Sequence, residues 1–154
     1  MSGYRKKWLA KNRAEGYSLR FIEYALKNLP EQTYIIFTFD WSEQCFVQFG
    51  NDYGEIFLDL PFWETNSYKD QEKNILKLLR KKGFVRRYWK RFRGKNGNYV
   101  FYNQPVAGNR GKVLKIEFGR DFKKATEVAL AIVEKAFYLQ YPRLTSYQSD
   151  RFSS

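Results

Sequence analysis

Apolar residues recur with the period of an α-helix between Ser18 and Pro30. They are Leu19, Ile22, Ala25, Leu26 and Leu29, which recur at helical spacing and therefore share one helical face. Ser18 belongs to the residue types that cap a first helical turn, and Pro30 cannot continue a helix. The pattern predicts a first helix over this stretch.

Three runs of alternating apolar and polar residues follow, at 33–40, 44–49 and 54–60. A period of two is typical of strands, and the turn residues between the runs predict an antiparallel meander. One face of this meander would form a core from Ile35, Phe37, Phe39, Val47, Phe49, Ile56, Leu58 and Leu60. The other face would carry Tyr34, Ile36, Phe46 and Phe57 among polar residues, which suggests either further burial or a protein-binding surface.

A second helix and a hairpin are expected next. Ser67 to Asp70 offers a capping box to a helix that Gly83 ends. The pair Asn96-Gly97 separates aromatic-rich runs at 85–93 and 98–104, and such a pair is a strong hairpin signal. We therefore predict a basic β-hairpin, although Val85, Tyr88, Trp89 and Phe92 also fit one face of a helix.

The chain then predicts a strand at 112–118 and a long helix at 121–138, and the polar residues after Pro142 are expected to fray. A length of 154 residues fits one domain. The expected organisation is a basic N-terminal arm at 1–16, a single α+β domain at 17–142 and a polar C-terminal tail at 143–154.

Element order and a few apolar signposts resemble a known fold. The order is α-β-β-β-α-β-β-β-α, with local cues in Leu78 to Phe84, in Asn98-Tyr99 and in Leu139 to Pro142. Together they resemble the type III secretion chaperone-like fold, with its Tir-chaperone-like and YbjN-like bacterial domains. The resemblance implies a small, non-enzymatic, often dimeric protein that holds an extended segment of another protein on apolar grooves.

Charge is strongly segregated along the chain. Between Glu31 and Glu72 nine acids face one base, a net charge of −8, whereas residues 73–115 carry fourteen bases and no acid. The whole chain has a net charge of +12 and 19% aromatic residues. A single domain with this pattern has a strong electric dipole, and its positive end should attract polyanions or an acidic protein surface.

Within the basic block, aromatic side chains alternate with the bases. Around residues 81–95, Phe84, Tyr88, Trp89 and Phe92 interleave with Lys and Arg, a composition that suits single-stranded nucleic acid. The aromatics can equally fill the core of a strand. The predicted basic surface consists of Lys81, Lys82, Arg86, Arg87, Lys90, Arg91, Arg93, Arg110 and Lys112.

Enzyme chemistry has little support in the residues present. The lone Cys45 has no His partner because the chain contains no His, and the same absence argues against a zinc site of the usual Cys/His type. Asp40, Glu43, Asp52, Glu55 and Asp59 invite a metal-dependent nuclease interpretation, but they fall on loops and on an alternating face. We expect no catalytic residues, no metal and no cofactor.

Two hypotheses follow. The first is a cytoplasmic, chaperone-like binding protein that holds a partner protein segment on Tyr34, Ile36, Phe46 and Phe57, with the basic hairpin docking an acidic surface and with homodimer formation as a further expectation. The second is a nucleic-acid-binding module that uses the basic aromatic hairpin. No signal or membrane segment is visible in the sequence, so no membrane partner is expected.

Overall fold

The computed structural model of the chain describes residues 18–61, 70–87, 99–102, 113–139 and 142–152. In these ranges it contains α2 (Arg20–Lys27), β1 (Thr33–Phe39), β2 (Ser42–Asp52), β3 (Glu55–Pro61), α4 (Glu72–Lys81), β4 (Val85–Arg87), β5 (Tyr99–Tyr102), β6 (Val113–Gly119), α5 (Phe122–Phe137) and β7 (Leu144–Arg151). The α+β class is confirmed.

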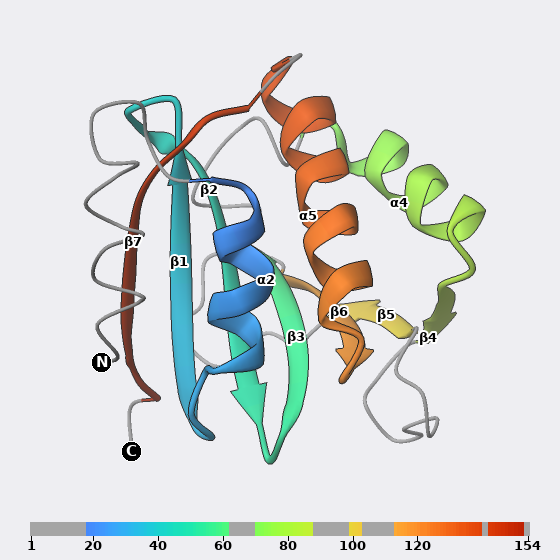
Figure 1. The fold of residues 1–154 in the computed structure, drawn as a ribbon. Coiled ribbons are helices and arrows are strands. Elements are labelled where there is room, and N and C mark those ends of the chain that lie inside the picture. The colour runs from blue at the N-terminus through green and yellow to red at the C-terminus, as the bar shows by residue number, and fades with distance from the viewer. Residues whose placement is uncertain (1–17, 62–69, 88–98, 103–112, 140–141, 153–154) are drawn as a thin grey trace, which may run out of the picture.

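The described strands form one mixed sheet that the helices cover on one face. The strand order is β4-β5-β6-β3-β2-β1-β7, with antiparallel neighbours except for the pair β4–β5. Helices α2 and α5 lie against the same face of the sheet, and α4 lies beside α5 above the β4 side (Figure 1). The sheet therefore has an inner face under the helices and an outer face on the opposite side.

The predicted meander is confirmed, including its inward face. All eight predicted core residues of β1, β2 and β3 are at most 2% exposed. The two hairpin loops have two residues each, and Asp40, Trp41, Tyr53 and Gly54 all have positive φ. Positive φ at both central residues gives the turn twist that suits two adjacent antiparallel strands, which explains why the meander closes so tightly.

Large rings build the centre of the core. Phe37 lies edge-on to Phe21 of α2 and to Phe49 of β2, with ring centroids 6.5 and 6.1 Å apart. The series continues through Phe118 to Phe84, 5.5 Å further on and next to α4. Edge-to-face pairs of this kind add to the stabilisation that burial alone provides. They also connect α2 at one end of the inner face to α4 at the other.

The predicted basic hairpin is wrong in its strand pairing. Val85–Arg87 forms β4, but β4 runs parallel to β5, whereas a hairpin closed by Asn96-Gly97 needs antiparallel neighbours. The other side of β5 is occupied by β6, so Tyr99 has Val85 on one side and Glu117 on the other. Residues 88–98, which connect β4 to β5, lie outside the described residues.

The residues after Pro142 do not behave as a fraying tail. Leu144–Arg151 forms β7, which pairs with β1 over its whole length and extends the sheet beyond the meander. Leu144 and Thr145 are buried, whereas the following residues are mostly exposed. A polar sequence is compatible with an edge strand because most of its side chains face solvent, and the polar composition therefore concealed the strand.

Candidate functional site

The four predicted apolar contact residues all lie on the outer face of the sheet. Tyr34, Ile36 and Phe46 are half-buried there, but Phe57 is only 8% exposed. Register places Tyr34 opposite Gly50 and Gly50 opposite Phe57, so Tyr34 and Phe57 flank one glycine. Of the two sequence-based interpretations of this face, further burial applies to Phe57.

Phe57 is covered by side chains of the same chain. Its ring lies 6.2 Å from the ring of Phe152, just after β7, and the Lys115 ammonium lies 3.8 Å from the Phe57 ring centroid. Below the ring is Gly50, where an added Cβ would come within 2.3 Å of Phe57 Cζ. Because glycine has no side chain, the ring of Phe57 can lie flat across β2. The ring in turn covers the strand backbone that Gly50 leaves exposed.

A bulky residue at position 50 should therefore destabilise the protein. We expect Gly50→Val to lower the free energy of unfolding by about 1–3 kcal/mol, because the ring of Phe57 must move. Gln48→Val, on the same strand and the same face, should leave it nearly unchanged. Urea unfolding followed by circular dichroism measures both changes. Equal midpoints for the two variants would show that Phe57 does not pack on Gly50.

The predicted basic residues are only partly described. Lys81 at the end of α4 and the adjacent Lys82 are exposed. Arg86 and Arg87 belong to β4 at the edge of the sheet, where the structure describes their backbone. Lys90, Arg91, Arg93, Arg110 and Lys112 lie outside the described residues.

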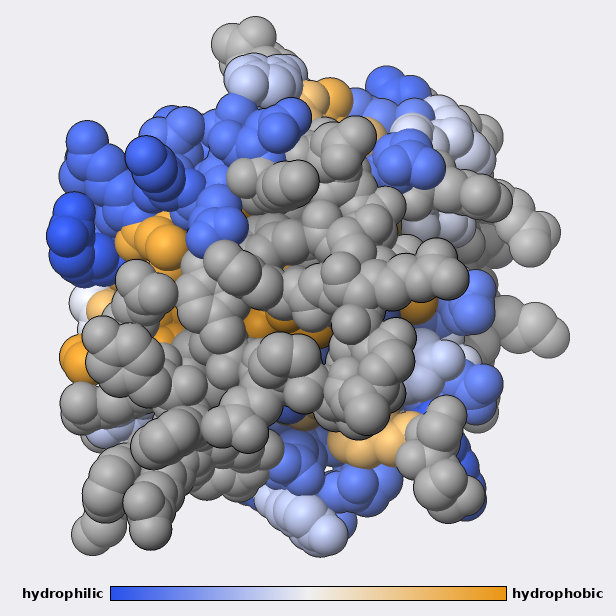
Figure 2. Space-filling view, turned by 180° about the vertical axis from the view of Figure 1, so that it is seen from behind, coloured by the Kyte–Doolittle hydropathy of each residue, from blue (hydrophilic) through white to orange (hydrophobic). Residues whose placement is uncertain are grey.

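Helix α4 presents an exposed side that is rich in bases. Lys73, Lys77, Arg80 and Lys81 are exposed, and Lys77 lies three or four positions from each of the other three, while Ile75 and Leu79 on the other side are buried. With a rise of about 1.5 Å per residue, Lys73, Lys77 and Lys81 follow each other at intervals of about 6 Å along the helix axis. Strongly hydrophilic residues gather on this side of the molecule, at the upper left of Figure 2.

These bases differ from the acids of the meander in how the fold uses them. None of the bases of α4 forms an ion pair with another described residue. By contrast, Asp40 Oδ1 accepts a hydrogen bond of 2.9 Å from the Arg143 N–H, and Asp52 Oδ1 accepts one of 3.4 Å from Gln32 Nε2. The acids hold turns and strand ends together, whereas the positive charge of α4 faces outward.

The first turn of α5 adds further bases beside α4. Asp121 caps this turn by accepting a 3.1 Å hydrogen bond from the Lys124 N–H, and the turn contains no acid. A groove of ≈ 380 Å³ between the two helices is lined by Lys82, Asp121, Lys123, Lys124, Glu127 and Val128. Lys124 reaches over Phe84, with its ammonium 4.7 Å from the ring centroid.

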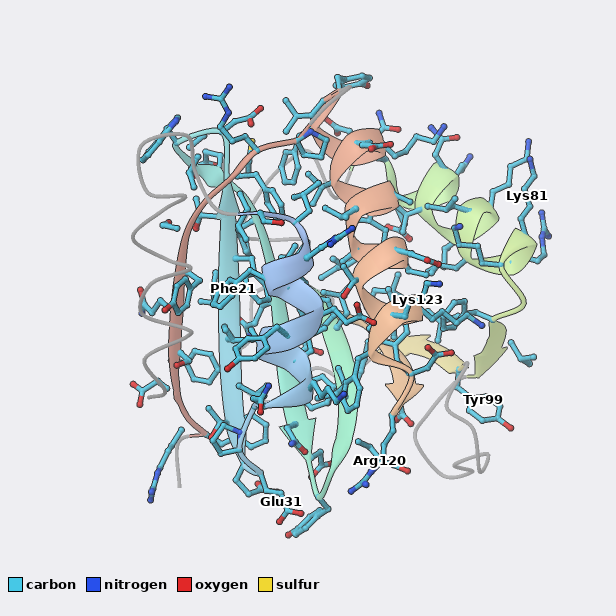
Figure 3. The ribbon with its side chains drawn as sticks, in the orientation of Figure 1. Phe21, Glu31, Lys81, Tyr99, Arg120 and Lys123 are labelled. Carbon is cyan, nitrogen blue, oxygen red and sulfur yellow. The ribbon has the colours of Figure 1, made fainter. Side chains whose placement is uncertain are left out.

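A second groove continues on the other side of the α5 N-terminus. It measures ≈ 450 Å³ and is lined by Arg20, Glu23, Tyr24, Lys27, Arg120, Asp121, Phe122 and Lys123. Both Arg120 and Lys123 extend from the start of α5 on the helix side of the molecule (Figure 3). Asp121 and Lys123 line both grooves, so the bases of α2, of the α5 N-terminus and of the end of α4 lie along adjoining grooves, with Glu23, Asp121 and Glu127 among them.

We call these residues the helix-side basic surface. It consists of Arg20, Lys27, Lys73, Lys77, Arg80, Lys81, Lys82, Arg120, Lys123 and Lys124. Sequence reasoning identified only Lys81 and Lys82 among them. The spacing of Lys73, Lys77 and Lys81 on a predicted helix could have indicated the basic side of α4. No local sequence pattern indicates that α2 and α5 bring their bases together.

The nuclease interpretation of the acids finds no support in their placement. Asp40 lies in the turn that precedes β2 and Asp52 ends β2, whose 11 residues span about 30 Å at 3.3 Å per residue. Among the described residues, no group of three or more His, Cys, Asp or Glu side chains lies close enough to hold a metal ion.

Burial raises the pKa of the Cys45 thiol, and the nearby Asp40 raises it further although a hydrogen bond to Ser42 opposes the shift, so this thiol is a poor nucleophile.

None of the helices in the described ranges is long and apolar enough to cross a membrane. Comparisons of the chain with models of known protein families, with curated proteins and with solved structures found no match.

Proposed function

We propose that this protein is a non-catalytic nucleic-acid-binding protein and that the helix-side basic surface is its contact surface. One observation carries the proposal: every base of α4 is exposed and none is paired with a described acid. Unpaired Lys and Arg side chains on one face neutralise phosphates and release their counterions, which supplies most of the affinity of a protein for a nucleic acid backbone.

Folding alone does not account for the positions of these bases. Cations are unfavourable near a helix N-terminus, where the helix dipole is positive. Lys73 lies in the first turn of α4, and Lys123 and Lys124 lie in the first turn of α5. Bases in a first helical turn oppose the helix dipole, so binding of a partner explains them better than fold stability does. Arg80 and Lys81 lie in the last turn of α4, where a cation favours both fold stability and binding.

The spacing of the bases favours nucleic acid over an acidic protein. Lys73, Lys77 and Lys81 form a regular series along a rigid helix, and the grooves extend this surface to Lys27 of α2. A regular series of cations suits a polymer whose anions also repeat regularly. Acidic side chains on a protein surface repeat in this way only where they share one face of a helix or strand, whereas every nucleic acid backbone carries a regular series of anions.

The chaperone-like hypothesis keeps one supporting observation. Tyr34, Ile36 and Phe46 lie on the outer face and are partly exposed, as a surface for an extended protein segment would require. The burial of Phe57 under Phe152 and Lys115 removes the fourth contact of that hypothesis. The chaperone-like hypothesis therefore stays a prediction. If the protein does not bind nucleic acid, the chaperone-like hypothesis becomes the leading one.

Lys123→Glu should change stability and binding in opposite directions. The substitution removes a cation from the first turn of α5 and adds an anion, so we expect the free energy of unfolding to rise by about 0.3–1 kcal/mol. Binding of a labelled oligonucleotide, measured by fluorescence anisotropy at about 0.15 M salt, should weaken several-fold because a phosphate contact is lost.

The matched control lies at the other end of the same helix. Lys135 is exposed in the last turn of α5, where a cation is favourable, and Lys135→Glu makes the same change in net charge. It should destabilise the fold slightly and leave oligonucleotide binding almost intact. Equal losses of affinity in the two variants, or no salt-dependent binding by the wild-type protein, would contradict the proposed function.

A further inference from the structure

Tyr24 is an exposed aromatic residue in the groove between α2 and α5, which Phe122 also lines. It follows Arg20 by four positions and precedes Lys27 by three, so the three side chains share one face of α2. Tyr24 is 36% exposed, whereas Phe21, Ile22, Ala25 and Leu26 of the same helix are buried. Arg120 and Lys123 line the same groove from the start of α5. An exposed ring thus lies among four bases.

We propose that the groove binds a single-stranded segment of nucleic acid, with one unpaired base stacked on Tyr24 and the neighbouring phosphates held by Arg20, Lys27, Arg120 and Lys123. This inference rests on the proposed function and makes it more specific. Under this inference the groove distinguishes single strands from duplexes, whereas a basic surface by itself binds both.

The ring of Tyr24 is supported from within the fold. It stacks on Phe21 with centroids 6.2 Å apart and an interplanar angle of 29°. Phe21 in turn contacts Tyr147 of β7 at 4.8 Å and Phe37 of β1 at 6.5 Å. A ring that is held on one side by packed rings loses little conformational freedom when a base stacks on its free side. This preorganisation reduces the entropic cost of binding.

The acids in the groove leave it positive. Glu23 and Asp121 stand against four bases, and Asp121 is engaged as the cap of α5 through its hydrogen bond to the Lys124 N–H. The phosphates of a strand in the groove would therefore meet more cations than anions among the residues that line it. Glu23, which precedes Tyr24 by one position on α2, would still repel the phosphates of a bound strand.

A single strand is the form of nucleic acid that this arrangement fits. In a duplex the faces of the bases are covered by their neighbours, so only an unpaired base can stack on a protein ring. Stacking on an aromatic side chain tolerates any base sequence because every base has a flat face. The groove should therefore bind single strands in preference to duplexes, with little sequence preference.

The test compares labelled single-stranded and double-stranded oligonucleotides of equal length by anisotropy, using the full chain. Tyr24→Ala should lower single-strand affinity by about fivefold to a hundredfold, whereas duplex affinity should be unchanged. Tyr24→Phe, which keeps the ring, should bind like the wild type, and Tyr24→Leu, which keeps apolar contact with Phe21, should bind like Tyr24→Ala. The dependence of affinity on salt should be the same in all four proteins, because no phosphate contact is removed.

Some outcomes would overturn the inference while leaving the proposed function intact. One is salt-dependent binding of single strands and duplexes with equal affinity, and another is unaltered single-strand affinity in Tyr24→Ala with a wild-type melting temperature. If the wild-type protein binds neither form, the proposed function fails together with the inference. A Tyr24→Ala loss shared by Tyr24→Phe would also contradict it, since a base needs the ring and not the hydroxyl.

Discussion

Removing residues 143–154 will destabilise the protein by several kcal/mol and is expected to abolish its cooperative unfolding transition. Leu144 is fully buried, and loss of a buried leucine alone costs about 2–5 kcal/mol. The truncation also leaves β1 without its partner on one side. A typical domain has only about 5–15 kcal/mol of stability, so this loss is a large fraction of the total.

Both ends of β7 are fastened to the meander by specific hydrogen bonds. At its start, the Trp41 N–H donates to Thr145 Oγ1 at 3.0 Å, and Thr145 Oγ1 donates to the Thr38 carbonyl at 3.2 Å. At its end, the Phe152 N–H donates to the Gln32 carbonyl at 2.8 Å. Truncation breaks these bonds together with the contact between Tyr147 and Phe21.

Thermal and urea unfolding followed by circular dichroism measure this effect. Leu144→Ala should lower stability by about 2–5 kcal/mol, whereas Gln148→Ala, an exposed position on the same strand, should have little effect. A truncated protein with the midpoint of the full chain would show that β7 is dispensable for the fold.

On the proposed function, neutralising the exposed side of α4 is expected to weaken nucleic acid binding strongly. The variant K73Q/K77Q/K81Q removes three bases that share one helical face. For single strands the logarithm of affinity changes with the logarithm of salt by about 0.7 for each phosphate contact, so the slope should fall by about 2. At about 0.15 M salt this corresponds to a loss of affinity on the order of tens of fold. Helix stability should hardly change because Lys and Gln have similar helix propensities.

The matched control removes three exposed bases far from α4 in the sequence. K135Q/R143Q/R151Q changes net charge equally but lies at the end of α5 and at the two ends of β7. Its salt slope and affinity should stay close to those of the wild type. If both triple variants lose the same affinity, total charge governs binding and the helix-side basic surface is not a site.

Local pattern was sufficient for the meander and for the face of it that forms the core. A period of two assigns every other residue of β1, β2 and β3 to one side, and short turns leave only antiparallel neighbours as partners. The predicted core residues, including Phe37 and Leu58, are buried for this reason. Helical periodicity also placed α2, α4 and α5, because an apolar stripe has to face the sheet. The N-cap of α4 is Gln71 and not a residue of the predicted capping box at 67–70, of which residues 67–69 lie outside the described residues.

Contacts between residues far apart in the sequence decided the features that no short stretch of sequence could predict. Thr145 and Trp41 are 104 positions apart, and their hydrogen bond belongs to a strand whose polar composition had suggested a loose tail. Asn96-Gly97 favoured a hairpin, yet β5 pairs in parallel with β4 on one side and antiparallel with β6 on the other. The helix-side basic surface arises in the same way. Lys27, Lys77 and Lys123 belong to three helices, and it is the packing of these helices on one face of the sheet that brings their charges into one surface.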